Sequence, residues 1–281
     1  MNHQKKEIKY KGKVVFEKRC VSYFKRIPKE YVENEACFIF INNGEFSVRS
    51  AFQYFQFSKG HGLLAKCANF FFEADKRQHT ESDYIEVIGI IFYPDIVNEL
   101  FDFDISNSNH TVNFNLKKIK INHLLENFRE SISILLDNPE IADEAFIGLK
   151  IKEFITLLSK TDNAPSHLDF LHSMFVLEEF NFKNAIKKNL YSNLSLSELA
   201  TLTNMSLSSF KRRFKDVFNE SPSKYINRKK IEKATKKIRF KENRITDICY
   251  EIGYDSIASF NRNFKKYTGV TPTQYRLDFI E

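Results

Sequence analysis

The sequence predicts an α+β protein with a strand-rich N-terminal domain, a helical segment after it, and an all-α C-terminal domain. Short runs of Val, Ile, Phe and Tyr separated by turns fill residues 8–95. Apolar residues spaced by three and four begin at residue 116, which is the period of an amphipathic helix. A segment near residue 206 recurs 50 residues later, so the C-terminal domain contains two copies of one unit.

Length and charge divide the chain into two domains, which we expect at residues 1–180 and 181–281. The 281 residues are 42% hydrophobic and 28% charged, so the chain can bury ordinary cores and is not disordered. The net charge of +7 combines −4 over the first domain with +11 over the second. A strongly basic domain beside a mildly acidic one predicts a polyanionic partner for the basic domain, namely nucleic acid.

The N-terminus and the cysteines predict a cytoplasmic protein. The four cysteines show no CxxC spacing, which is typical of a reduced compartment. The first residues, MNHQKKEIKYKGK, lack the apolar segment of a signal peptide. The longest apolar stretch, residues 85–93, is far shorter than the roughly 20 residues that cross a bilayer, so we expect no membrane segment.

The strand-rich part predicts a small sandwich or barrel of about seven strands. Residues 36–41 and 46–49 flank the turn Asn42–Glu45 and predict a hairpin. A set of phenylalanines along these strands is expected in the core, namely Phe38, Phe40, Phe46, Phe55 and Phe57. A small apolar effector inside the barrel remains an open alternative, because no cluster of polar residues identifies its site.

Three helices are predicted after the strands, over residues 116–136, 141–158 and 166–180. The first has two open interpretations: it packs on the barrel, or it forms an antiparallel dimer contact with a second copy. The second interpretation assigns the contact to the apolar positions Ile121, Leu124, Leu125, Phe128, Ile132 and Leu135. The dimerisation segment would then cover about 116–180.

The repeat in the C-terminal domain pairs residues 206–215 with 256–265. Ser, Ser, Phe, Arg, Phe and Lys coincide at an offset of 50, and residues 221–225 match 271–275 at the same offset. Residues 196–200 match 245–249 at an offset of 49, so the second copy has one extra residue in its turn.

Each copy predicts a short helix, a tight turn and a longer helix. Ser195 or Ser197 is expected to cap the first short helix, and Thr246 the second. Asn204 and Gly253 fall in the turns, where a residue that tolerates positive φ is useful.

The longer helices predict a DNA-binding face. Their phenylalanines lie four residues apart and should pack inward, which leaves small, polar and basic residues outward. Such a face suits insertion into a major groove, since small residues allow close approach and Arg and Lys reach bases or phosphates. The candidate DNA-binding residues are Ser208, Ser209, Lys211, Arg212 and Lys215 in the first copy, and Ala258, Ser259, Asn261, Arg262 and Lys265 in the second.

Residues 183–280 resemble the DNA-binding domain of the AraC/XylS family of bacterial transcription regulators, and residues 245–276 follow the family signature closely. The resemblance implies two helix-turn-helix motifs joined by a linker helix over residues 222–240. It also implies a cupin-like N-terminal β-barrel with dimerisation helices, most similar to the sensor domains of type III secretion activators. The implied partners are a double-stranded DNA operator, RNA polymerase and a second copy of the chain.

Some residues depart from the family pattern. Lys230 stands where the family usually has Arg, and Ile257 and Ala258 stand where many members carry polar base-reading residues. We therefore expect the second motif to read fewer bases, or to read them through thymine methyls. Five linker lysines were expected to meet phosphates or to be solvated, namely Lys224, Lys229, Lys230, Lys236 and Lys237.

The sequence argues against an enzyme. His61 and His79 lack the HxH spacing of a cupin metal site, and no GxSxG, P-loop or GxGxxG motif occurs, so no metal or cofactor is expected. The predicted function is sequence-specific transcription regulation, with activation as the expected sign, controlled through the N-terminal domain by a small effector or a partner protein. The alternative is an architectural DNA-binding protein without effector control.

Overall fold

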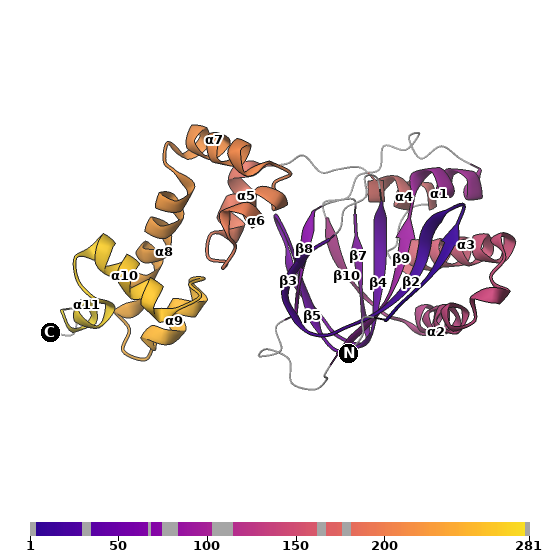
Figure 1. Ribbon diagram of the computed structural model, residues 1–281, viewed down its shortest axis with the longest axis horizontal. Helices are drawn as coiled ribbons and strands as arrows, with labels where there is room; N and C mark the ends of the chain where they lie inside the picture. The colour runs from indigo at the N-terminus through magenta and orange to yellow at the C-terminus, as the bar shows by residue number, and fades with distance from the viewer. Residues whose placement is uncertain are drawn as a thin grey trace. The chain divides into compact units, whose positions relative to one another are not determined.

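The computed structural model describes residues 4–29, 35–66, 69–74, 84–102, 115–161, 167–175 and 181–278 (Figure 1). The chain forms two compact units, residues 1–179 and 180–281, each of which is described by itself. The first contains the strands together with five helical segments, and the second is entirely helical, so the fold class is α+β as predicted.

The strands of the first unit form two antiparallel sheets. The six-stranded sheet has the order β1 (Gln4–Tyr10), β2 (Lys13–Val21), β9 (Ile85–Phe92), β4 (Ala36–Asn43), β7 (His61–Ala65) and β10 (Leu116–Lys120). The four-stranded sheet has the order β3 (Phe24–Pro28), β8 (Phe70–Ala74), β5 (Phe46–Ser50) and β6 (Tyr54–Phe57). Among the described strands no hydrogen-bonded ladder joins the two sheets into a closed barrel.

The predicted hairpin of residues 36–49 is wrong. β4 pairs with β9 on one side and β7 on the other, whereas β5 pairs with β6 and β8 in the second sheet. Because β4 lies between two partners, no free edge remains for β5. Gly44, at φ 76°, turns the chain from one sheet into the other, and its Cα lies so close to Tyr84 O that a Cβ would sit 2.7 Å from that oxygen.

Two apolar cores hold the first unit together. One includes residues of both sheets, with Phe46 stacked on Phe57 at 5.7 Å between ring centroids. The other joins the six-stranded sheet to the helices, and in it Phe154 contacts the rings of Phe38 and Phe128. Of the five phenylalanines predicted as core, Phe55 is half-buried and the other four are buried.

The helices of the first unit are α1 (Pro94–Phe101), α2 (His123–Asp137), the short 3₁₀ turn η3 (Pro139–Ile141), α3 (Glu144–Thr161) and α4 (His167–Phe175). The prediction of helix from residue 116 is wrong, because residues 116–120 extend the sheet as β10 against β7. The helix begins only after Asn122, whose side chain accepts a hydrogen bond from the N–H of Leu125. The sequence did not predict α1, and residues 162–166 and 176–180 lie outside the described part.

The structure separates the six residues proposed for dimerisation. Leu125, Phe128, Ile132 and Leu135 are buried in the core between α2 and the sheet, so in this unit they serve packing. Ile121 precedes the helix and is partly buried. Leu124 alone of the six is exposed, at 60% of its surface.

The second unit contains α5 (Phe182–Asn189), α6 (Leu196–Leu202), α7 (Leu207–Phe218), α8 (Pro222–Ile238), α9 (Ile245–Glu251), α10 (Ile257–Thr268) and α11 (Pro272–Leu277). Figure 1 shows α8 running between α7 at one end and the α9–α10 pair at the other. The turn between α9 and α10 is one residue longer than that between α6 and α7, as the repeat predicted. No helix in the described ranges is long and apolar enough to cross a membrane.

Candidate nucleic-acid interface

The first motif, α6 and α7, begins with a complete capping box. Ser195 accepts a hydrogen bond from the N–H of Glu198 at 3.2 Å, and the Glu198 carboxylate accepts one from the Ser195 N–H at 2.7 Å. Asn204 occupies the turn at φ 55°, the left-handed conformation that Asn tolerates. The sequence therefore predicted this cap and this turn correctly.

The second motif, α9 and α10, starts differently. Its first helix has Arg244 at the N-cap position with no side-chain cap. The predicted cap, Thr246, is wrong, because this residue lies inside the helix and its hydroxyl is 3.3 Å from the Asp247 carboxylate. Gly253 occupies the turn at φ 80°.

The longer helices α7 and α10 have matching ends. Ser206 and Ser256, 50 residues apart, are the N-caps and accept hydrogen bonds from the N–H groups of Ser209 and Ser259. At the other ends, Asn219 and Gly269 adopt left-handed conformations as C-caps. The repeat in the sequence thus produces two helices of the same length with the same start and end.

The faces of α7 and α10 follow the prediction as well. Phe210, Phe214, Phe260 and Phe264 are completely buried. Ser209 and Ser259 are half-buried, because each lies in the first turn beside its capping serine. The remaining candidates are exposed, namely Ser208, Lys211, Arg212, Lys215, Ala258, Asn261, Arg262 and Lys265.

The cations of α7 and α10 differ from those of α8 in their partners. Within the described part of the chain, Lys211, Arg212 and Lys215 make no ion pair, and the same holds for Arg262 and Lys265. Five of the seven α8 cations share three carboxylates: Lys224 and Arg228 pair with Glu220, Arg228 and Lys229 with Glu232, and Lys233 and Lys237 with Glu251. Within the described residues, the candidate cations of the two repeated helices therefore have no carboxylate partner that an external anion would have to displace.

Lys230 contradicts its prediction, since it neither faces solvent nor is placed to meet a phosphate. It is 7% exposed, and its ammonium donates hydrogen bonds to the carbonyl oxygens of Ser192 at 2.9 Å and Gly253 at 2.7 Å. Burial lowers the pKa of this ammonium to about 8, and Asp255 partly opposes that effect.

Comparison with known proteins gives two matches that together cover most of the chain. Residues 199–278 match a helix-turn-helix domain family, and residues 36–170 match the ExsA N-terminal regulatory domain family. The chain belongs to the AraC/XylS family of transcription regulators. The relatives that it matches are transcription regulators, not enzymes.

Individual relatives of this AraC/XylS regulator match parts of it. An uncharacterized HTH-type transcriptional regulator of Staphylococcus aureus is 36% identical over 93 residues, which are 33% of this chain and 12% of that protein. The virulence regulon transcriptional activator VirF of Yersinia enterocolitica is 28% identical over 132 residues, 47% of this chain and 49% of VirF. The chain therefore spans half or less of these relatives.

Among solved structures, ToxT from Vibrio cholerae aligns with 95% of this chain and 100% of its own, at 15% identity and a TM-score of 0.39. The C-terminal domain of the response regulator yesN from Fusobacterium nucleatum aligns with 34% of this chain and 93% of its own, at 28% identity and a TM-score of 0.32.

Sequence reasoning missed two residues of this AraC/XylS regulator at its candidate interface. Leu207, the first residue of α7, is 39% exposed, while its repeat partner Ile257 packs partly on the second core. Arg213 is exposed, but its guanidinium lies 5.3 Å from the centre of the Phe182 ring. Alignment at the offset of 50 could have indicated Leu207, because the pair Leu207 and Ile257 is apolar in both copies.

No group of three His, Cys, Asp or Glu within the described ranges is arranged to hold a metal ion. Burial and the nearby Lys118 and Lys120 lower the pKa of His61. His79, the other histidine considered from the sequence, lies outside the described residues.

Proposed function

We propose that this regulator binds a specific DNA operator through both repeated helices and activates transcription from it. α7 and α10 would enter successive major-groove segments, with Arg212 and Arg262 nearest to base edges. Ser208, Ser209 and Ser259 would allow close approach, and Lys211, Lys215 and Lys265 would contact phosphates or bases. Ala258 and Asn261 would complete the second face.

One observation carries this proposal. Two helices of equal length and matching caps each present exposed cations without an ion pair among the described residues, whereas five of the seven cations of the helix between them share three carboxylates. An ordinary solvated helix surface has no reason to repeat this pattern at a fixed offset. Ala258 stands where α7 has Ser208, which favours a thymine methyl there and a shorter sequence requirement than at α7.

Selection of binding sites from a random pool of double-stranded DNA tests the proposal. Specific regulation predicts a recovered motif with two parts, of which the part read by α7 carries more information. Recovery of DNA without any shared motif would support the architectural alternative instead. Transcription in vitro with purified RNA polymerase on the recovered site then tests activation, because an activator raises transcript yield and a repressor lowers it.

We further propose that the first unit controls this activity, through a small effector or a partner protein that shifts the equilibrium between DNA-competent and incompetent states. The match to a family of N-terminal regulatory domains supports control by this unit. Native mass spectrometry of the full chain distinguishes a small effector from a partner protein. A retained small molecule identifies effector control, and a retained protein identifies control by a partner.

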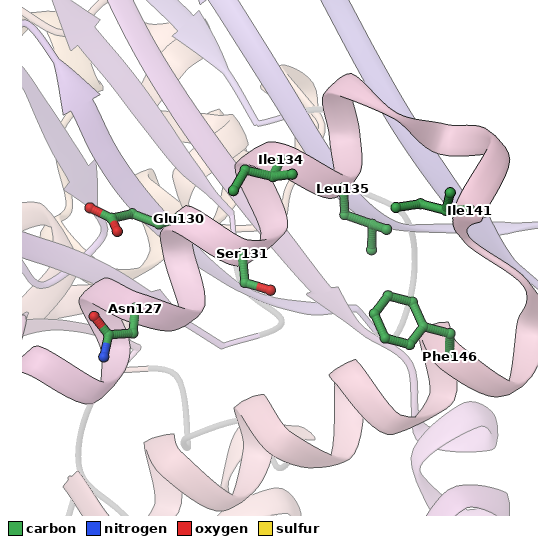
Figure 2. Close-up of a pocket in the computed structure, with 7 residues that line it drawn as sticks. All are labelled: Asn127, Glu130, Ser131, Ile134, Leu135, Ile141 and Phe146. Atoms are coloured by element: carbon green, nitrogen blue, oxygen red, sulfur yellow. The ribbon is translucent and has the colours of Figure 1, made fainter.

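Of the six residues named from the sequence for a dimer contact, only Leu124 is exposed, so a dimer contact would use Leu124 with other exposed residues. Large apolar side chains are exposed along α2, η3 and α3, in the order Leu124, Ile134, Ile141, Phe146 and Leu149. Three of them, Ile134, Ile141 and Phe146, line a groove of about 450 Å³. Figure 2 shows Leu135, Ile141 and Phe146 facing one another at one end of this groove. We propose that a second copy of the chain covers this face, since exposed patches of this kind mark association sites.

A further inference from the structure

The second unit has two apolar cores rather than one. The first core contains Phe210 and Phe214 of α7, and the start of α8 packs on it through Tyr225 and Ile226. A separate core contains Phe260 and Phe264 of α10. The end of α8 supplies Ile231, Ala234 and Ile238 to this second core. Apolar packing therefore fixes each motif to α8 but does not fix the two motifs to each other.

Where the two motifs meet, the contacts are polar. The turn after α5, at Tyr191 and Ser192, lies against the turn of the second motif at Gly253. Lys230 of α8 donates to a carbonyl oxygen of each turn, Ser192 O and Gly253 O, at 2.9 and 2.7 Å. Its ammonium also lies 5.4 Å from the centre of the Tyr254 ring. One buried cation thus joins the linker helix, the turn between α5 and α6, and the turn of the second motif, and we call this junction the Lys230 seam.

Weaker contacts surround this seam. Asn193 is 3.4 Å from the Asp255 carboxylate, and Tyr254 donates to the Asn227 side chain at 3.1 Å. Lys233, one turn after Lys230 on α8, lies 4.0 Å from the centre of the Tyr191 ring. Each of these contacts joins elements that belong to the two different cores, or joins such an element to α8. Polar contacts at the seam therefore connect the two motifs where no shared apolar core does.

A buried ammonium is a costly way to gain stability. Its desolvation opposes the hydrogen bonds it makes, which is why burial lowers the pKa of Lys230 to about 8. An apolar residue of similar size at position 230 would avoid this desolvation but would leave the two carbonyl oxygens without the lysine donor. What an apolar side chain cannot do is donate to two carbonyl oxygens at once, and two directed bonds fix the distance between the turns that carry them.

We propose that Lys230 is a positioning residue that sets the spacing between the two recognition helices and hence the half-site spacing that the protein accepts. This inference rests on the proposed function, because it needs both α7 and α10 to contact one operator. Inserting one base pair between half-sites rotates one against the other by about 35° and moves it by about 3.4 Å. A rigid seam prevents the motifs from following that movement, whereas a loosened seam allows it.

The test uses the full chain and the site recovered by selection, with zero, one or two base pairs inserted or removed between its two parts. We expect the wild-type protein to lose at least about tenfold in affinity for a one-base-pair change. The Lys230→Met variant should bind the unaltered site more weakly and lose less than about threefold on the same change. Lys230→Arg, which can donate to both carbonyls, should restore the wild-type spacing profile.

Lys236→Met is the matched control, since it removes a charge from the same helix at an exposed position. It should lower affinity for all spacings by the same factor or not at all. An unchanged spacing profile in Lys230→Met overturns the inference while the proposed function stands. Failure of the selection to return any two-part motif overturns the proposed function and this inference with it.

A second measurement does not depend on the operator. Encoded spin-labelled residues at exposed positions 216 of α7 and 266 of α10 report the distance between the two helices. Pulsed electron resonance should give a narrow distance distribution in the wild-type chain and in Lys230→Arg, and a broader one in Lys230→Met. Equal widths in all three proteins would contradict a positioning role. Circular dichroism of each variant checks that both motifs remain helical.

Discussion

Gly253 packs so closely on Ser192 that it has no room for a side chain: a Cβ at residue 253 would lie 2.5 Å from the Ser192 carbonyl oxygen. It would also collide with the carbonyl oxygen of Tyr191. The corresponding residue of the first motif, Asn204, is exposed. The two copies therefore differ at this position because one turn packs against residues 191–192 in the Lys230 seam and the other faces solvent.

Gly253→Ala should destabilise the second unit by at least about 2 kcal/mol, because it adds a backbone collision to the cost of a positive φ. Gly269→Ala is the matched control: its φ is 87°, and a Cβ there meets nothing within 4 Å, so the expected loss is only about 1 kcal/mol. Urea unfolding of the two variants measures the difference. Equal losses would mean that the collision is relieved by movement of the 191–192 turn.

The ionisation of Lys230 predicts a pH dependence of stability. Its native pKa of about 8 lies below the ordinary value of 10.5, so the unfolded chain binds this proton more tightly than the folded one. The free energy of unfolding should therefore rise as the pH increases from about 8 to 10.5, by up to about 3 kcal/mol from this residue. Denaturant titrations of the wild type and Lys230→Met across this range should differ by that rise. Parallel curves would place the native pKa near 10.5.

Because of the repeat, the helices of the two C-terminal motifs could be predicted from the sequence. The signals that place α6, α7, α9 and α10 are local: capping serines, turn residues and phenylalanines four apart all lie within one motif. The seam was not predictable, because it brings together three distant segments, at Ser192, Lys230 and Gly253. From sequence alone a lysine on a basic helix indicates a solvated charge, and only tertiary contact identifies it as buried.

The sheets of the first unit were harder to predict, because their strands pair with partners that are distant in the sequence. β4 and β5 were recognised as strands, but nothing in the turn at Gly44 distinguishes a hairpin from a crossing between sheets. Residues 116–120 contain three lysines and two apolar residues. This pattern fits the first turn of the helix that follows as well as it fits a strand. Their partner β7, more than 50 residues earlier, decides in favour of the strand.

The two faces of α2 predict opposite responses to substitution. Phe128 is buried between α2 and the sheet, so Phe128→Ala should cost about 3–5 kcal/mol of unfolding free energy. Ile134 is 62% exposed, so Ile134→Asp should cost less than about 1 kcal/mol but weaken self-association if a second copy covers this face. Sedimentation velocity of the full chain over a range of concentrations measures association. A dimer unaffected by Ile134→Asp would place the contact elsewhere.

The two short helices of the motifs predict different sensitivities to loss of a hydroxyl. Ser195→Ala removes the cap of α6 and half of the capping box, which should cost about 1 kcal/mol. Thr246→Ala removes a hydroxyl from the first turn of α9 that bonds no backbone N–H, so the expected change is within about 0.5 kcal/mol. Thermal unfolding of both variants compares them directly. A larger loss for Thr246→Ala would show that α9 depends on a cap the structure does not contain.

Arg212 and Arg262 occupy equivalent exposed positions on α7 and α10, so their replacement compares the two motifs directly. Arg212→Ala should cost about 1–3 kcal/mol of binding free energy on the selected operator and relax preference at one base position. Arg262→Ala should cost less in specificity, because Ala258 stands where α7 has Ser208 and leaves fewer polar contacts beside Arg262. Lys188→Ala, which removes an exposed charge from α5 outside both motifs, controls for net charge.

Binding affinity measured over a range of salt concentrations shows what each arginine contacts. An unchanged salt dependence with an altered base preference identifies a base contact. A slope of log affinity against log salt reduced by about one, with the same loss of affinity for all sequences, identifies a phosphate contact. If neither arginine variant alters binding to the selected site, α7 and α10 are not the recognition helices.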